Sequence, residues 1–145
     1  EQKLFGVDIS EKLIEVAKNR SRSNGNIEYF AGDMKEKSFG NFDYIVAMDS
    51  LIHYSPEDVI SSIAEFSKRA NYSVLFTVIP STFALRTKLS LGKYFPKSER
   101  SPEVVPIEWG QLRQLEDLKI NACLEKIKRI KSFFYVSEVW ELANK

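Results

Sequence analysis

The sequence predicts an α/β fold, a mostly parallel, doubly wound sheet with an antiparallel edge contributed by its C-terminal end. Three observations carry this prediction. Short apolar runs and helical segments alternate in the order β-α-β-β-α-β over residues 3–80. Three of the runs end near an aspartate, namely Asp8, Asp33 and Asp49. Residues 121–145 are rich in β-branched and aromatic side chains, which favours two antiparallel strands over a helix.

The composition is that of one ordinary globular domain. The chain has 145 residues, of which 43% are hydrophobic and 28% charged, and its formal net charge is +1. This balance gives no general attraction to nucleic acid. The single cysteine, Cys123, excludes an internal disulfide and a cysteine-cluster metal site, and no apolar run is long enough for a transmembrane segment. We expect residues 1–145 to be a single domain without a metal site.

The N-terminal part predicts a strand, a helix and a second strand. The first strand covers residues 3–8, and the chain opens in it without a Met, so we expect the natural N-terminus to lie upstream. Residues 10–20 predict a helix, with Ser10 as its N-cap. The stripe expected to be buried on this helix is Leu13, Ile14, Val16 and Ala17. Turn residues at 21–26 end the helix, and residues 27–34 form the second strand.

The central part predicts a strand, a helix and a strand. Residues 42–50 are nearly continuous in apolar side chains, as in strands buried on both faces. Because only residues 35–41 link them to the second strand, either the two strands are not sheet neighbours or the link hides a short helical turn. Ser55 and Pro56 begin a helix whose buried face is Val59, Ile60, Ile63, Ala64 and Phe66. A fourth strand covers residues 72–80.

The C-terminal part is less regular. Residues 81–95 predict a helix, and residues 96–106 predict a loop rich in proline and charge. A second helix is expected over residues 107–118, with Ile107, Leu112, Leu115 and Leu118 on its inner face. We expect residues 81–118 to form helices and a loop on the substrate side, inserted before the last two strands.

The three aspartates are the first candidates for a binding site, because open α/β sheets bind ligands beyond the carboxyl ends of their strands. Asp8 suits the two hydroxyls of a ribose, or it caps the helix that follows. Asp33 suits an adenine amino group, or it forms a turn after Gly32. Asp49 lines the same pocket, or it is the solvated end of a strand. The glycine-rich loop that usually lies about 20 residues before a ribose-binding acid would precede this chain.

His53 and a basic segment are the remaining candidates. His53 is the only histidine, so a Ser-His-Asp hydrolase or a histidine-based zinc site cannot be built from this chain alone. It is either a hydrogen-bonded structural residue or a residue that acts on a ligand. The segment from Arg86 to Arg100 gathers five basic and two aromatic residues. It is either a lid for a flat anionic ligand or a solvated loop.

These residues resemble a known family. "LFGVDIS", "IEYFAGDM" and "FDYIVAMDSLIHY" resemble the second, third and fourth strands of the class I S-adenosylmethionine (SAM)-dependent methyltransferases, which have a Rossmann-like fold. More narrowly, "DSLIHYSPED", "TVIPSTFALRTKLSLGKYFP" and "FFYVSEVWEL" resemble the magnesium-protoporphyrin IX O-methyltransferases of chlorophyll and bacteriochlorophyll synthesis. The resemblance runs from Lys3 almost to the end of the chain. It implies that the first strand and the glycine loop of the fold lie outside this sequence.

The resemblance implies methyl transfer from SAM to a propionate carboxylate of magnesium protoporphyrin IX. The residues implied in SAM binding are Asp8 and Ile9 at the ribose and adenine, Asp33 and Met34 at the adenine, and Met48 and Asp49 at the methionine part. The implied catalytic residues, facing the acceptor, are His53 and Tyr54. The implied substrate-binding residues, which would meet the second propionate, are Arg86, Lys88 and Lys93. Because a central strand is expected to be missing, the chain alone is expected to bind SAM weakly and to be inactive.

Partners and alternatives follow from the same resemblance. It implies that the large subunit of magnesium chelatase hands over the porphyrin. It also implies a cytoplasmic location, or a plastid one in a eukaryote, and leaves peripheral membrane contact open. One alternative is a class I methyltransferase with another small acceptor, and a second is an inactive module that binds SAM. A more distant alternative is a Rossmann protein that binds NAD or a nucleotide sugar.

Overall fold

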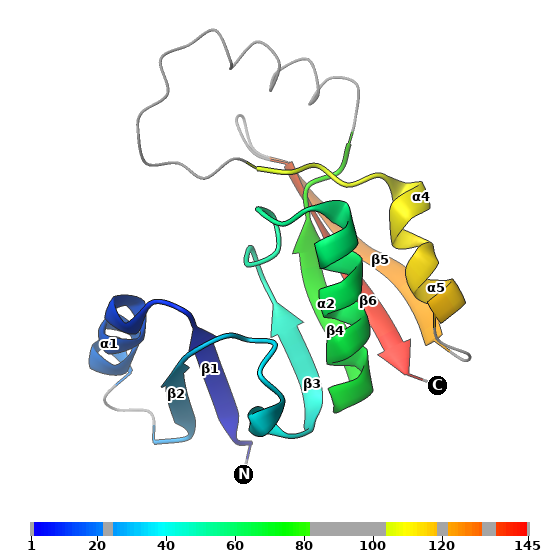
Figure 1. Ribbon diagram of the computed structural model, residues 1–145. Helices are drawn as coiled ribbons and strands as arrows, with labels where there is room; N and C mark the ends of the chain where they lie inside the picture. Colours follow the sequence, from blue (N-terminus) through cyan, green and yellow to red (C-terminus); the bar gives the residue numbers. More distant parts are fainter. Residues whose placement is uncertain (1, 22–24, 82–103, 119–121, 132–135, 145) are drawn as a thin grey trace, which may run out of the picture. The chain divides into compact units, whose positions relative to one another are not determined.

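The computed structural model describes residues 2–21, 25–81, 104–118, 122–131 and 136–144 (Figure 1). Strands and helices alternate up to residue 78 in the predicted order β-α-β-β-α-β, with a short 3-10 turn before the third strand. The chain divides into two compact units, Glu1–Gly40 and Asn41–Lys145. The predicted helix at 81–95 and most of the loop at 96–106 lie outside the described residues.

The first unit contains two parallel strands and one α-helix. Its elements are β1 (Leu4–Asp8), α1 (Glu11–Arg20), β2 (Ile27–Ala31) and the 3-10 helix η1 (Lys37–Phe39). The Ser10 hydroxyl accepts a hydrogen bond from the N–H of Leu13 at 3.3 Å, which confirms Ser10 as the N-cap of α1. Both expectations for the short link after β2 are met. The link contains a helical turn, η1, and among the described strands β2 pairs with β1 and not with the third strand.

Glycine at position 6 lets the Tyr29 ring of β2 pack directly against β1. Gly6 lies opposite Tyr29 in the parallel register. A Cβ atom on Gly6 would lie 2.7 Å from Cδ1 of Tyr29, so the ring or the strand would have to shift to accommodate it. The Tyr29 ring therefore lies against the bare backbone of β1, and its hydroxyl reaches Oγ of Ser21 at 2.7 Å.

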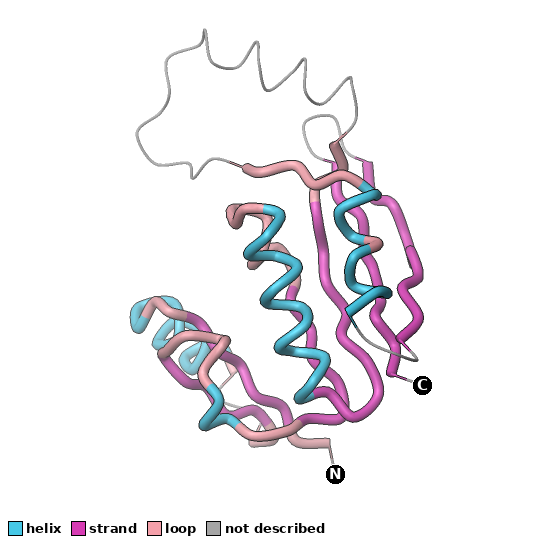
Figure 2. Tube along the Cα trace, turned by 45° about the vertical axis from the view of Figure 1, so that its right-hand side comes forward, coloured by secondary structure: helices cyan, strands magenta, loops and turns pink. Residues whose placement is uncertain are grey.

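The second unit is a four-stranded mixed sheet with its helices on one face (Figures 1 and 2). Its elements are β3 (Phe42–Ala47), α2 (Pro56–Arg69), β4 (Ala70–Val78), α4 (Trp109–Leu112), α5 (Gln114–Leu118), β5 (Ala122–Lys131) and β6 (Val136–Asn144). The strand order is β3-β4-β6-β5. β3 and β4 are parallel, whereas β6 is antiparallel to both β4 and β5, which confirms the predicted antiparallel edge.

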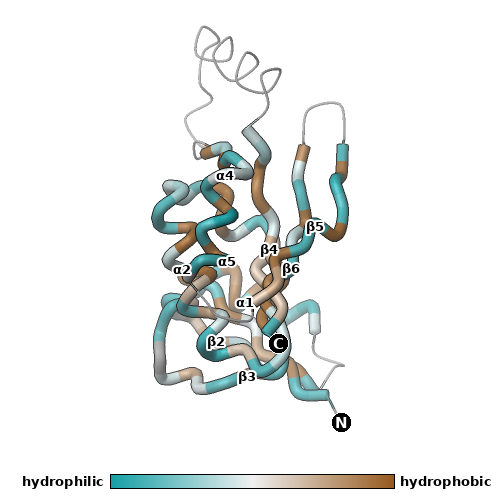
Figure 3. Tube along the Cα trace, turned by 90° about the vertical axis from the view of Figure 1, so that its right-hand side faces the viewer, coloured by the Kyte–Doolittle hydropathy of each residue, from teal (hydrophilic) through white to brown (hydrophobic). Residues whose placement is uncertain are grey.

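The hydrophobic core of the second unit lies between its helices and the sheet, where hydrophobic segments of α2, α5 and β4 gather in Figure 3. The buried hydrophobic residues of α2 are Val59, Ile60, Ile63 and Phe66, all of them predicted. From β4, Val74 and Phe76 are 0% exposed. Ser55 caps α2, since its hydroxyl accepts from the N–H of Asp58 at 3.1 Å and donates to the carboxylate of Asp58 at 2.9 Å.

β3 is less buried than its apolar sequence predicts. Tyr44, Val46 and Met48 are 59%, 61% and 50% exposed, whereas Ala47 is buried. Alternate side chains of a strand point to opposite faces, and the described helices of this unit cover one face of the sheet. β3 also lies at the edge of the described sheet. The expectation that this strand is buried on both faces is therefore wrong for the described structure.

The helix predicted at 107–118 is two short helices, and the first of them starts at Trp109. Ile107 is extended instead, because its N–H donates to the carbonyl of Ile79 and its carbonyl accepts from the N–H of Ser81, both at 2.8 Å. The predicted inner face is still buried at Ile107, Leu112 and Leu115, which are 1–3% exposed. Backbone pairing with the end of β4 thus overrides the local helical pattern.

Candidate active site

Two of the three aspartates lie at the same end of the two-stranded sheet in the first unit. Asp8 ends β1, and its Oδ1 accepts a hydrogen bond from the N–H of Ser10 at 2.8 Å. The Asp8 carbonyl accepts from the N–H of Gly32 at 3.0 Å, which extends the strand pairing to the residue before Asp33. The helix cap is Ser10, so Asp8 does not have the capping role that was its alternative.

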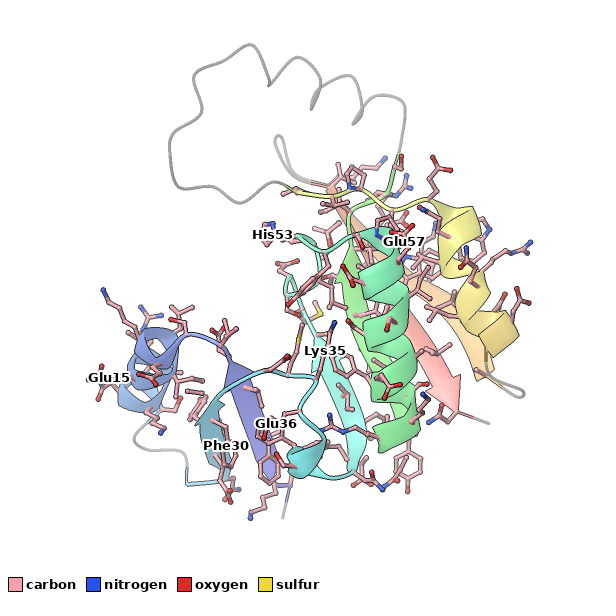
Figure 4. The ribbon with its side chains drawn as sticks, in the orientation of Figure 1. Glu15, Phe30, Lys35, Glu36, His53 and Glu57 are labelled. Atoms are coloured by element: carbon pink, nitrogen blue, oxygen red, sulfur yellow. The ribbon has the colours of Figure 1, made fainter. Side chains whose placement is uncertain are left out.

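Asp33 organises the turn that follows β2. Its Oδ1 accepts from the N–H of Lys35 at 2.9 Å, and its carbonyl accepts from the N–H of Glu36 at 3.0 Å. Of the two interpretations of Asp33, the structure therefore shows the turn after Gly32. Figure 4 places Lys35 and Glu36 on this loop. Two apolar candidates follow the aspartates in sequence. Ile9, after Asp8, is 83% exposed, and Met34, after Asp33, is half-buried.

In the second unit, the chain turns sharply at Asp49 after β3. Asp49 has a φ of 53°, the one positive φ at a non-glycine residue in the described part of the chain. Its N–H donates to Oγ1 of Thr77 at 2.7 Å, and the Thr77 hydroxyl donates to Oδ1 of Asp49 at 3.1 Å. Thr77 belongs to β4 and is 1% exposed. The end of β3 is thereby tied to the neighbouring strand by a residue that sequence reasoning missed.

The turn between β3 and α2 carries His53 and Tyr54 directly after two buried residues. Leu51 and Ile52 are 1% and 9% exposed, and the Ile52 carbonyl accepts from the N–H of Val105 at 2.8 Å. His53 is exposed, and in Figure 4 its ring points away from α2. Tyr54 is 36% exposed. His53 and Tyr54 thus lie on a turn whose backbone is held by hydrogen bonds at Ile52, with Val105, and at Asp49, with Thr77.

A pocket of about 500 Å³ opens beside α4, and sequence reasoning missed its residues too. Trp109 and Trp140 line it and stack with ring centroids 4.7 Å apart. Glu138, also in the lining, is 5% exposed and accepts hydrogen bonds from Nε of Arg129 at 2.7 Å and from Nε1 of Trp140 at 3.2 Å. A polar residue inside an apolar run was the signal in the sequence that could have indicated both residues. Glu138 lies in "VSEVWEL", and Thr77 lies in "VLFTVIP".

The structure places the remaining candidates as follows. Asp8 and Asp33 share one end of the first unit's sheet, while Met48, Asp49, His53 and Tyr54 follow β3 in the second unit. Arg86, Lys88 and Lys93 lie outside the described residues. Within the described ranges, no group of three His, Cys, Asp or Glu residues could hold a metal ion. No helix in those ranges is long and apolar enough to cross a bilayer.

Comparisons with known proteins match both parts of the chain. The family described as the C-terminus of magnesium-protoporphyrin IX methyltransferase matches residues 47–144, and a general methyltransferase domain family matches residues 1–71. A magnesium-protoporphyrin O-methyltransferase of Rhodobacter capsulatus is 41% identical over 95% of this chain and 61% of its own length. The enzyme of that name from Synechocystis is 24% identical over 77% of this chain and 50% of its own length.

A solved structure shows the same fold. The crystal structure of the Synechocystis magnesium protoporphyrin IX methyltransferase with bound SAH aligns with a TM-score of 0.82 at 22% identity. The alignment covers 99% of this chain and 64% of that one, and it confirms the predicted Rossmann-like methyltransferase fold. The chain spans between half and two thirds of the length of these relatives. Since the family match covers more than half of its 145 residues, the chain belongs to the magnesium-protoporphyrin IX methyltransferase family.

Proposed function

We propose that this protein transfers a methyl group from SAM to a propionate carboxylate of magnesium protoporphyrin IX, forming the monomethyl ester. Family membership and the 41% identical relative support the reaction. The structural observation that carries the proposal is the position of Asp8, Asp33 and Asp49, each at or just after the C-terminal end of a strand of a parallel pair. Open α/β sheets bind their ligands at this end.

The first unit suits the adenosine part of SAM. Because the N–H of Ser10 orients Asp8, a fixed carboxylate stands at the end of β1, where it could accept from both ribose hydroxyls. The exposed Ile9 offers an apolar surface to the adenine ring, and Met34 would lie beside the ring. Asp33 would accept from the adenine amino group. These residues fit SAM, which supplies an electrophilic methyl group when bound.

The second unit suits the methionine part of SAM and the acceptor. Met48 and Asp49, directly after β3, would lie beside the methionine part. The acceptor carboxylate is already a nucleophile at neutral pH, so no strong base is required. The work of the protein is to align the carboxylate oxygen with the methyl carbon and the sulfur and to exclude water. His53 would orient the carboxylate by donating a hydrogen bond, or contact the magnesium ion, with Tyr54 beside it.

Residues 81–118 would form the substrate side of this domain. Arg86, Lys88 and Lys93 are proposed to bind the second propionate, on the strength of their charge and their position after β4. Replacing all three with glutamine should raise the KM for the porphyrin and leave the KM for SAM unchanged. A triple variant with an unchanged porphyrin KM would contradict this assignment.

The decisive experiment supplies the product of the complete gene with methyl-labelled SAM and magnesium protoporphyrin IX. We expect a labelled ester that alkali hydrolyses, and no such product would overturn the proposal. Asp8→Asn should weaken SAM binding by roughly tenfold or more, because a charged hydrogen-bond acceptor is lost. Glu11→Gln, an exposed acid on the next helix, is the matched control. Transfer to another small acceptor but not to the porphyrin would instead favour a methyltransferase of different specificity.

The 145-residue chain by itself should bind SAM weakly. Asp8 and Asp33 belong to one sheet and Asp49 follows a strand of another, and no described strand pairing joins these two sheets. Titration calorimetry of the chain with SAM measures this directly. Low-micromolar binding would contradict this expectation and show that the 145 residues suffice for a SAM site.

We propose that the large subunit of magnesium chelatase donates the porphyrin to this protein. We also propose that this protein is cytoplasmic and contacts membranes peripherally. The chemistry supports handover, because a large, mostly apolar macrocycle is poorly soluble in water. Porphyrin presented on the purified chelatase subunit should be methylated faster than the same concentration of free porphyrin. Equal rates would contradict handover, and failure to co-sediment with anionic vesicles would contradict membrane contact.

A further inference from the structure

The backbone at Asp49 is held in a conformation that its own sequence does not enforce. Its φ of 53° lies in the left-handed region, which aspartate tolerates better than most residues but does not prefer. Such a conformation persists where the surroundings determine it. Two hydrogen bonds to one hydroxyl, at 2.7 and 3.1 Å, supply that determination here.

Thr77 is well placed to hold this turn. It lies in β4, the parallel neighbour of β3, and it is 1% exposed, so water does not compete for its hydroxyl. A hydroxyl can accept and donate at once, which allows Thr77 to bond both the N–H and the carboxylate of Asp49. Valine has nearly the same shape but can make neither bond.

The turn leads directly to the residues proposed to meet the acceptor. After Asp49 the chain buries Leu51 and Ile52 and then presents His53 on the outside (Figure 4). The N–H of Val105 holds the middle of the turn through the Ile52 carbonyl at 2.8 Å. Thr77 therefore holds the start of the turn, and the direction in which the chain leaves β3 depends on it.

We propose that Thr77 is a positioning residue for methyl transfer, because its two hydrogen bonds to Asp49 fix the turn that aims residues 50–54 at the acceptor. This role rests on the proposed function. It predicts that the fold persists without the hydroxyl, and that alignment in the reacting complex is lost to a greater extent than SAM binding.

The test compares Thr77→Val and Thr77→Ser with wild type in the product of the complete gene. Misplacement by about 1 Å can cost on the order of a hundredfold in rate, so Thr77→Val should lower kcat by about ten- to a hundredfold. The KM for SAM should rise by a smaller factor than kcat falls, because Asp49 is one of several residues proposed to bind SAM. Thr77→Ser keeps the hydroxyl and should restore most of kcat.

Ser73→Ala is the matched control. Ser73 lies on the same strand, is 2% exposed, and its hydroxyl has no hydrogen-bond partner in the described structure. Losing a buried hydroxyl there should leave kcat unchanged. An equal fall in kcat for Ser73→Ala and Thr77→Val would overturn the proposal, as would a failure of Thr77→Ser to restore activity.

A measurement on the wild-type protein keeps the proposal testable if Thr77→Val does not fold. The Asp49 amide should exchange with solvent at least about a hundredfold more slowly than an unfolded amide, because Thr77 binds it. Unprotected exchange would overturn the proposal. If the wild type transfers no methyl group, the proposed function and this role fail together. If the wild type is active and Thr77→Val matches it, only the role of Thr77 fails.

Discussion

The two units of this chain differ in how much of their apolar surface they bury. Among the described residues, Ile14 is the sole contribution of the first unit to the buried hydrophobic core, and the second unit supplies the rest. Ile9 and Leu13 of the first unit are 83% and 57% exposed. Two strands and a short helix cannot enclose their own side chains, whereas four strands under α2 enclose Ile63 and Phe76 completely.

A few aromatic contacts between its strands and η1 hold the first unit together. Phe30 stacks on Phe5 at 5.9 Å and packs against Phe39 at 5.6 Å (Figure 4 labels Phe30). The ion pair between Lys3 and Glu28 is exposed on both sides and contributes little. The same strand-helix-strand pattern thus yields a core only when enough neighbouring strands are present. We expect the first unit to open more readily than the second.

The largest effect is expected from emptying the core of the second unit. Phe76→Ala should destabilise the protein by about 3–5 kcal/mol, because it removes a fully buried ring and leaves a cavity. Ile14→Ala, in the first unit, should cost less, about 1–2 kcal/mol, because its surroundings are exposed and can collapse. Chemical denaturation measures both. Equal losses in the free energy of unfolding would contradict the expected difference in burial between the two units.

A buried charge in the second unit should give the next largest effect. Arg129→Ala leaves the Glu138 carboxylate, 5% exposed, without its shortest ion-pair partner, at a cost of about 2–3 kcal/mol. Adding Glu138→Gln should recover part of this loss, because the uncompensated charge disappears. Lys128→Ala, an exposed neighbour on β5, is the control. Thermal unfolding that fails to separate Arg129→Ala from this control would contradict the prediction.

A smaller effect, confined to the first unit, is expected at Gly6. In Gly6→Ala the new methyl group meets the Tyr29 ring at 2.7 Å and should cost about 1–2 kcal/mol. Gly25→Ala is the matched control, because nothing lies within 4 Å of a Cβ there. Hydrogen exchange should quicken in β1 and β2 for Gly6→Ala alone, while β4 keeps its protection. Faster exchange in β4 would mean that the two units do not open independently.

The smallest effects are expected at the two helix caps. Ser55→Ala should cost about 1 kcal/mol, because the Ser55 hydroxyl both accepts from and donates to Asp58. Ser10→Ala should cost about 0.5 kcal/mol, because its single bond to Leu13 is longer, at 3.3 Å, and exposed. Amide exchange in the first turn of α1 and of α2 reports each cap. A larger loss at Ser10 would reverse the expected order.

Much of the fold was predictable from the sequence because its signals are local. Ser10, Ser55 and Pro56 act within one helical turn of where they stand, and α2 buries the apolar side chains that its periodicity indicates. The β-branched and aromatic content of residues 121–145 also indicated the strands β5 and β6, which pair antiparallel. The turn at Asp33 is likewise a matter of neighbouring residues.

Other features depend on partners that are distant in sequence. The bonds between Asp49 and Thr77 join residues 28 positions apart, and Ile107 is extended because it pairs with Ile79 and Ser81. The exposure of Val46 depends on which face of the sheet the helices cover.

The sequence by itself determined the alternation of strands and helices, the helix caps and the family to which the chain belongs. Only the tertiary structure decided how the turn that bears His53 is held, and which apolar residues are buried. The physical reason is the separation in sequence of the residues that interact, because hydrogen bonds within a few residues close caps and turns. A core or a strand-end turn forms only when the chain brings distant strands together.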